Sequence, residues 1–320
     1  MKYENHKDLK RNIGVLLFAI GLVVISVYYS YHSITAIALG VPSSSSSTST
    51  TAAATTNTTL NQIILLNNKG TSLYNLGRFN ESIVYFDKAL DIDPNNVVAL
   101  DNKGSALLSV SIKNYTQAIS YFDKALDIDP KNIAALFHKG NALAGLGNYT
   151  QAITYYNRVL TIDPKNVATL DNRGVAFYHL GNYSQAITYY DKALAIDPNN
   201  AVALTDKGNA LSALGNFAVS IAYFDKALTI DPKSVLALIG KGYALDNLGS
   251  HTKAVTYYDK AISIDPRYIA DLTHKGNFLI GLGNYKLAIM YFDKALAINP
   301  KNVDAAAGKR QAQTALSQLK

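Results

Sequence analysis

The sequence predicts an all-α fold: seven helix–turn–helix units stacked as a solenoid, followed by a capping helix and preceded by one transmembrane helix. Three observations predict it. One motif recurs from residue 63 onward, the apolar spacing inside the motif is helical, and a long stretch near the start carries no charge. The composition suits a folded chain, because 48% of the 320 residues are hydrophobic and 17% are charged.

Composition and motifs exclude several function classes. The net charge of +7 is spread along the chain, whereas nucleic-acid binding needs a clustered basic face. The absence of Cys excludes disulfides, thiolate zinc sites and Cys nucleophiles. The sequence contains no HExxH, GxSxG, Walker or Rossmann motif, and its histidines lack metal-ligand spacing. We therefore predict no enzymatic activity, no metal, no cofactor and no small-molecule substrate.

The N-terminal region predicts a membrane anchor. Residues 13–31 are apolar and would span about 28 Å as a helix, close to the thickness of a bilayer core. Basic residues lie only before this segment, which places the tail 1–12 in the cytoplasm and the repeats outside. The alternative is a signal peptide cleaved near Ala36–Ala38, which would give a secreted protein.

Residues 32–62 predict a flexible linker. Much of this stretch is Ser and Thr, and no charged residue lies between Arg11 and Lys69. Such a composition buries too little apolar surface to offset the entropy of ordering.

The repeats are marked by a Gly that follows a basic residue and by a Pro near the end of each unit. The glycines are Gly70, Gly104, Gly140, Gly174, Gly208, Gly242 and Gly276, and the prolines are Pro94, Pro130, Pro164, Pro198, Pro232, Pro266 and Pro300. The units are 63–96, 97–132, 133–166, 167–200, 201–234, 235–268 and 269–302, within a repeat region of 63–302, and 303–320 is the capping helix.

Each unit predicts two helices, as the fourth shows. Its first helix is Val167–Leu180, a Gly-Asn corner follows, and its second helix is Gln185–Ile196. The corner glycine suits a left-handed helix end, and the corner asparagine is expected to cap the second helix. Asparagines just before the first helices, such as Asn200, are expected to cap those helices.

Recurring small and aromatic residues resemble the tetratricopeptide (TPR) repeat. The first small residue is Ser82, Ala118, Ala152, Ala186, Ser220, Ala254 or Ala288, and the aromatic is Phe86, Phe122, Tyr156, Tyr190, Phe224, Tyr258 or Phe292. The Trp usual in this family is Leu in every copy. The resemblance implies a right-handed α-α superhelix whose concave wall is formed by the first helices. It also implies a non-catalytic protein-binding function and a prokaryotic source.

Two further side chains recur in every unit. The basic residue before the Gly is expected to lay its stem on the core and to pair its charged head with a recurring Asp. A Tyr precedes the core aromatic, and we expect it to pack between second helices with its hydroxyl in water. An aromatic ladder for sugars is the less favoured alternative.

Function should lie where the copies differ, on the exposed face of the first helices. The predicted partner-binding groove consists of Asn68, Asn102, His138, Asn141, Asn172, Asp206, Asn209, Tyr243, His274 and Asn277. Asn side chains both donate and accept, which suits an extended peptide. We expect replacement of Asn141, Asn209 and Asn277 by Ala to weaken partner capture and to leave melting little changed.

Five Asn-x-Ser/Thr sequons are candidate N-glycosylation sites. They are Asn57, Asn80, Asn114, Asn148 and Asn182. The last four are expected at the corner between helices, where a capping role for Asn is the alternative.

The sequence therefore favours a protein-interaction scaffold at the outer face of a membrane, which binds a peptide or helix of a partner in the concave groove. One alternative is an accessory subunit of an envelope enzyme such as a glycosyltransferase or peptidase. Another is a structural surface spacer.

Overall fold

The computed structural model describes residues 50–111, 114–265, 269–281 and 283–319. Side chains at 50–57, 251, 269–271, 274 and 278 lie outside this description. The predicted tail 1–12, the predicted membrane helix 13–31 and the start of the predicted linker are also outside it. Within the described ranges, none of the helices has both the length and the apolarity that a bilayer span requires.

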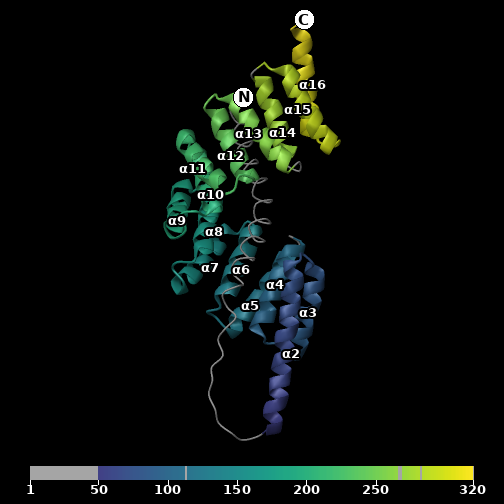
Figure 1. The fold of residues 1–320 in the computed structure, drawn as a ribbon, viewed down its shortest axis with the longest axis vertical. Coiled ribbons are helices and arrows are strands. Elements are labelled where there is room, and N and C mark those ends of the chain that lie inside the picture. Colours follow the sequence, from purple (N-terminus) through teal and green to yellow (C-terminus); the bar gives the residue numbers. More distant parts are fainter. Residues whose placement is uncertain (1–49, 112–113, 266–268, 282, 320) are drawn as a thin grey trace. The chain divides into compact units, whose positions relative to one another are not determined.

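Every regular element in the described ranges is a helix. In chain order the helices are α2 (Thr50–Asn75), α3 (Phe79–Ile92), α4 (Val97–Val110), α5 (Tyr115–Ile128), α6 (Ile133–Gly145), α7 (Tyr149–Ile162), α8 (Val167–His179), α9 (Tyr183–Ile196), α10 (Ala201–Ala213), α11 (Phe217–Ile230), α12 (Val235–Asn247), α13 (His251–Ile264), α14 (Ile269–Gly281), α15 (Tyr285–Ile298) and α16 (Val303–Gln318) (Figure 1). The all-α prediction is confirmed, and the hand of the superhelix stays a prediction.

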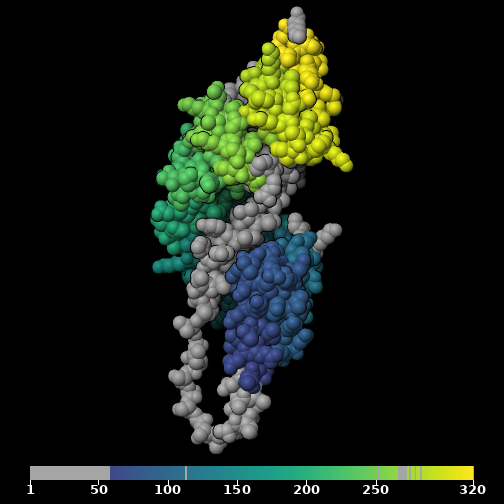
Figure 2. Space-filling view, turned by 45° about the vertical axis from the view of Figure 1, so that its right-hand side comes forward, coloured from purple at the N-terminus to yellow at the C-terminus, as the bar shows by residue number. Residues whose placement is uncertain are grey.

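The described helices fall into two compact units, which divide between Asn182 and Tyr183. In the N-terminal unit, each helix from α2 to α8 packs on the next, and α2, α4, α6 and α8 also contact one another in order. In the C-terminal unit, α10 contacts α12 and α14 contacts α16 in the same way. Contacts between successive second helices are weaker, so the first helices form the inner row of each unit. Figure 2 shows the purple-to-blue helices α2–α5 as one closely packed block.

The corner inside six of the seven units is closed by a glycine and two backbone hydrogen bonds, whereas the unit 97–132 has no glycine at its corner. At the end of α6, Gly147 has φ 81°, and its N–H donates to the Ala144 carbonyl at 2.9 Å. The Asn148 N–H donates to the Leu143 carbonyl at 2.8 Å, which completes a Schellman motif. The second helix then begins at once, so α9 starts at Tyr183 and not at the expected Gln185.

The asparagine at this corner does not cap the second helix with its side chain. Asn148 and Asn216 precede α7 and α11, and neither side chain makes a capping hydrogen bond. That part of the prediction is wrong at these two corners, where the Schellman bonds hold the chain through its backbone.

The predicted caps of the first helices are confirmed. The Asn132 side chain accepts from the Ala135 N–H at 3.0 Å, and Asn96, Asn166, Asn200 and Asn302 do the same for their helices. Each such bond satisfies one of the backbone donors that a helix N-terminus leaves free.

Close approach of paired helices explains the repeated glycine. A Cβ added at Gly140 would lie 2.5 Å from Cε1 of Tyr156, whose ring is wholly buried. Gly104 meets Phe122, and Gly208 meets Phe224, in the same way. The glycine and the aromatic therefore form one packing unit that recurs along the chain.

The start of α2 corrects the predicted linker. Residues 50–62 were expected in the flexible stretch, but α2 begins at Thr50 and runs without interruption for 26 residues. The sequence has no Pro or Gly between Pro42 and Gly70, and Ala52–Ala54 favour a helix. The buried Ile63 then ties the helix to the first unit.

The C-terminal helix α16 closes its stack. Ala305 and Gly308 are buried against the cluster around Phe292, while Ala306 is only half-buried and Ala307 is exposed. Arg310 stands 34 residues after Gly276, where the other units have the packing glycine. Arg310 is exposed and departs from the packing glycine that all seven units keep at this position.

Candidate partner-binding groove

The predicted groove residues belong to first helices and therefore to the inner rows. Asn68 on α2 is exposed, and Asn102 on α4 is half-buried. The side chain of His274 lies outside the described residues. The other predicted residues divide into those tied to neighbouring side chains and those that remain accessible.

His138 is tied to the preceding first helix. Its Nδ1 lies 2.9 Å from Oδ1 of the buried Asp101 and 3.1 Å from the Ser105 hydroxyl. Burial lowers the pKa of His138, but the Asp101 carboxylate outweighs burial and leaves the pKa above its usual value. Both partners meet the same ring nitrogen, unlike the Ser and Asp of a hydrolase triad, which meet different nitrogens. His138 therefore joins α6 to α4 through a hydrogen bond that becomes an ion pair when the ring is protonated.

Asn141 is also a structural residue. Its Oδ1 accepts from the Tyr156 hydroxyl at 2.9 Å and from the Asn172 amide at 2.9 Å. Replacing Asn141 by Ala would leave the buried Tyr156 and Asn172 donors without this acceptor, which costs about 1–3 kcal/mol per buried group. The expectation that Asn141 can be removed without affecting melting therefore conflicts with this geometry.

Asp206 in the C-terminal unit has an incompletely satisfied carboxylate. Asn209 on the same helix donates to it, but Oδ2 is buried and has no hydrogen-bond partner among the described residues. Burial raises the pKa of Asp206 to about 7, against the lowering effect of the Asn209 bond. The equivalent position is Asn in α2, α4 and α8.

Asp206→Asn is expected to raise the free energy of unfolding at about pH 8 by about 1–2 kcal/mol. The folded chain keeps the Asp206 proton up to about pH 7, whereas the unfolded chain releases it near the ordinary value of 3.8. Wild-type stability therefore falls as pH rises through this window, and an amide removes that loss. Urea unfolding at about pH 4, 6 and 8 measures it, with the exposed Asp304→Asn as control. If the variant's gain in free energy of unfolding does not grow with pH, the raised pKa of Asp206 is contradicted.

Two predicted residues of the C-terminal unit remain accessible. Tyr243 on α12 is 39% exposed, and its ring meets Phe217 edge-on at 6.1 Å. Asn277 on α14 is exposed. An aromatic face and a free amide on one inner row can provide apolar contact and hydrogen bonding to a peptide.

Sequence reasoning missed Asp101, Ser105, Tyr156 and Phe217 as partners of the groove residues. Asp101 and Ser105 lie 37 and 33 residues before His138, close to one repeat period. Contacts between equivalent faces of successive first helices were therefore the signal available.

The predicted pairing of the repeated basic residue with a repeated Asp is confirmed in five of the seven units, and Lys309 of the capping helix adds a sixth pair. The prediction is wrong for Lys69, which has no ion pair among the described residues. The ion pairs are Lys103–Asp87, Lys139–Asp123, Lys207–Asp191, Lys241–Asp225, Lys275–Asp259 and Lys309–Asp293. The Asp always comes from the second helix of one pair and the Lys from the first helix of the next. In α7, Asn157 occupies the position of the Asp.

The repeated Tyr takes part in the same cluster, so its hydroxyl is not simply in water as expected. Lys207 Nζ lies 4.2 Å from the centre of the Tyr223 ring and donates to its hydroxyl at 2.7 Å. Burial lowers the pKa of Lys207, but the bonds to Asp191 and Tyr223 outweigh burial and raise it overall. These rings belong to the joints.

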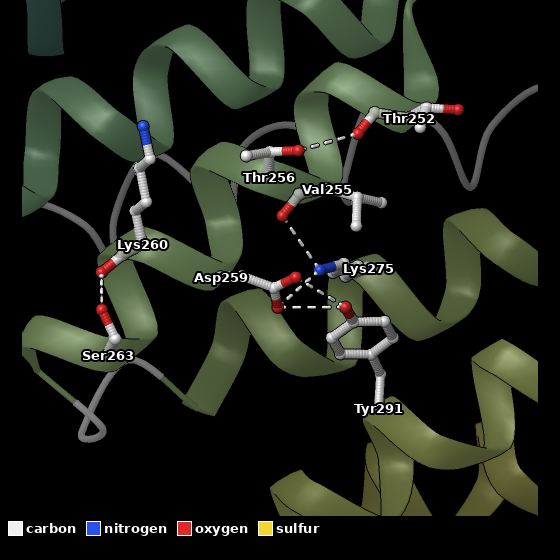
Figure 3. Close-up of polar contacts among 8 residues, drawn as sticks. All are labelled: Thr252, Val255, Thr256, Asp259, Lys260, Ser263, Lys275 and Tyr291. Atoms are coloured by element: carbon white, nitrogen blue, oxygen red, sulfur yellow. Dashed lines mark hydrogen bonds and ion pairs between the residues drawn. The ribbon is translucent and has the colours of Figure 1, made fainter.

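The joint around Lys275 is the most deeply buried (Figure 3). The Lys275 side chain is 1% exposed, and Nζ donates to Asp259 Oδ1 at 2.9 Å and to the Val255 carbonyl at 3.1 Å. The Tyr291 hydroxyl donates to the same carboxylate at 3.0 Å. Burial lowers the pKa of Lys275 to about 8 despite the Asp259 charge.

The sequons occupy two kinds of position. Asn80 lies inside α3, not at the corner as expected, and the Ser82 of its sequon is buried with its hydroxyl donating to the Phe79 carbonyl. Asn148 and Asn182 are exposed at corners, and Asn114 is half-buried. The Asn57 side chain lies outside the described residues.

Several solved structures share this fold. A chain of the APC/C hetero-tetramer Cut9–Hcn1 has a TM-score of 0.66 at 20% identity, over 76% of this chain and 48% of that chain. This chain thus spans about half the length of that relative. A tetratricopeptide repeat protein from Parabacteroides merdae has a TM-score of 0.62 at 19% identity, over 79% and 99% of the two chains. PilF of Pseudomonas aeruginosa has a TM-score of 0.57 at 18% identity, over 65% and 94%.

No curated protein matches this chain. Family models, all described as tetratricopeptide repeat, match residues 63–96, 113–171, 172–200, 189–218, 205–269 and 272–302. Together they cover more than half of the sequence. This chain therefore belongs to the tetratricopeptide-repeat family.

Proposed function

We propose that this chain is a non-catalytic scaffold that holds a peptide or helix of a partner protein on the inner row of its C-terminal unit. Tetratricopeptide-repeat proteins generally mediate protein–protein interaction through such extended surfaces. The observation that carries the proposal is that the side chains of Tyr243 and Asn277 are exposed. Both residues directly follow the packing glycine, where the residue type differs from unit to unit. A preformed row of helices binds with little ordering cost.

The inner row of the N-terminal unit supports the choice of the C-terminal unit. There, His138, Asn141 and Asn172 are engaged with neighbouring side chains. A ligand would have to break those bonds, whereas Asn277 is exposed to solvent. A solvent-facing group loses less free energy on binding, because it gives up contacts with water and not a bond to another side chain.

We further propose that residues 13–31 anchor the chain in a membrane, with the repeats on the outer face. The support is the sequence alone: an apolar stretch of bilayer length, flanked by basic residues on one side only. Intact protein should then remain in the membrane fraction through an alkaline wash. Recovery of a soluble chain that lacks its first residues would favour the signal-peptide alternative.

The partner site is tested by cross-linked capture from intact cells, read by mass spectrometry. The full chain is compared with a Tyr243→Ala, Asn277→Ala variant and with a control, Lys253→Ala, whose side chain is exposed on the second helix α13. We expect one partner to be captured in similar amounts by the wild type and the control. The double variant should capture about tenfold less of it, or even less than that. Urea unfolding of each variant checks that the fold is intact.

Two other outcomes would contradict the proposal, and a third would refine it. Equal capture by all three chains would show that the binding surface lies outside this row. No enriched partner would favour the surface spacer. A captured envelope glycosyltransferase or peptidase lost in the double variant would identify the chain as that enzyme's accessory subunit.

A further inference from the structure

Lys69 on α2 is the first member of the repeated lysine series, and its environment differs from that of the others. Lys103, one unit later, is largely buried, pairs with Asp87 and lies 4.3 Å from the centre of the Tyr121 ring. Lys69 is exposed, and within the described residues it has no ion pair and lies over no ring. The described part of the chain has no second helix before α2 to supply an Asp.

The rest of this face of α2 is also uncovered. Leu65 is 69% exposed, whereas the equivalent Ala99 of α4 is completely buried against the preceding pair. Ser72 is exposed, whereas the equivalent Ala106 is completely buried. We call Leu65, Lys69 and Ser72 the open face of α2.

The residues next to the open face along the sequence offer no counter-charge to Lys69. No Asp or Glu lies between Asp8 and Glu81, so the apolar segment 13–31 has none. Glu81 on α3 is already paired with Arg78. The proposed anchor would hold Glu4 and Asp8 on the other side of the membrane, so we take the carboxylate for Lys69 to come from another protein.

The helix α16 differs from α2 at the equivalent positions. On α16, Lys309 is paired with Asp293, and Arg310 replaces the packing glycine. In α2 the glycine is kept, the lysine lacks an acid among the described residues, and the exposed Leu65 stands where an alanine is usual. An exposed apolar surface with a polar rim is typical of an interaction surface.

We propose that the open face of α2 docks an amphipathic helix of another protein, which carries an aspartate opposite Lys69 and small apolar residues opposite Leu65. This helix would take the place that a second helix takes at every Lys–Asp joint of the chain. The charge of Lys69 fixes the register of the partner, and Leu65 supplies the apolar contact. The surface is separate from the inner row that the proposed function uses.

The chain itself provides a probe. Helix α5 already packs on α6 with Asp123 paired to Lys139, so a labelled peptide of residues 115–128 imitates the partner. A short helix is marginal in water, and a hydrocarbon staple between positions 116 and 120, both exposed in the chain, holds it helical. A peptide with Asp123→Asn is the matched control. Fluorescence anisotropy with the full chain in detergent measures binding.

We expect Lys69→Gln to weaken peptide binding about tenfold and Asp123→Asn in the peptide to do the same. Combining both changes should cost about tenfold and not a hundredfold, because both remove one ion pair. Lys88→Gln, an exposed lysine on α3, should leave binding unchanged. Leu65→Glu should abolish binding, because it replaces the apolar contact of the open face with a charge.

Other results would overturn the proposal. These are no binding by the stapled peptide, or equal binding by the Asp123→Asn peptide. Binding that appears only after residues 2–31 are deleted would show that the chain's own N-terminal segment occupies the face. Self-association of the full chain that the peptide displaces would make a second copy the occupant. Sedimentation velocity on the same samples distinguishes the last two cases.

Discussion

Replacing Gly140 by Ala is expected to lower the free energy of unfolding by about 2–3 kcal/mol. The added Cβ would lie 2.5 Å from Cε1 of Tyr156, well inside contact distance. The ring cannot move aside freely, because it is wholly buried and its hydroxyl donates to Asn141. The small helical gain of Ala over Gly, about 0.5–1 kcal/mol, does not offset the overlap.

Gly281→Ala is the matched control for this change. Gly281 is the last residue of α14, and a Cβ added there would meet nothing within 4 Å. Its replacement should leave stability unchanged or raise it by about 0.5 kcal/mol. Urea unfolding followed by circular dichroism compares the two variants. Equal midpoints would show that close helix approach does not explain the repeated glycine.

Replacing Asp259 by Ala is expected to lower the free energy of unfolding by about 3 kcal/mol. The variant keeps the Lys275 ammonium in a site where its side chain is 1% exposed, without the carboxylate that balances it. The Tyr291 hydroxyl loses its acceptor in the same step. An unpaired buried charge costs more than the pair itself contributes, so removal of one partner has a large effect.

Asp293→Ala removes the same repeated aspartate at the C-terminal joint and serves as its control. Lys309 is 31% exposed, so water can solvate its charge when the partner is lost. The expected loss is about 0.5 kcal/mol. Similar losses for Asp259→Ala and Asp293→Ala, again by urea unfolding, would show that burial of the lysine does not set the strength of these joints.

The strictness of the repeat made much of the fold predictable from the sequence. The helix pairs, the Asn132 type of cap and the pairing of Lys139 with Asp123 all depend on residues that recur at one spacing. A side chain that is repeated in every unit meets the same neighbours in every unit. Its local role can therefore be inferred once and transferred along the chain.

The candidate site was harder to predict, because it depends on contacts between different side chains of successive units. The helical pattern places Asn141 on the right face but does not show that Asn172 and Tyr156 occupy its Oδ1. The start of α2 was misplaced for a related reason. Composition favoured disorder over 50–62, while the absence of helix breakers allowed the helix to extend upstream from Ile63.

The Lys–Asp joints also bear on how such a chain changes during evolution. Each joint takes its acid from the end of one unit and its base from the start of the next, as Asp191 and Lys207 show. Excision or duplication of any whole number of matching units therefore rejoins an acid with a base. Recombination can therefore change the number of units without leaving an acid or a base of a joint unpaired. The helix α16 is different, because Arg310 stands where every unit keeps its packing glycine, so α16 cannot replace the first helix of a unit.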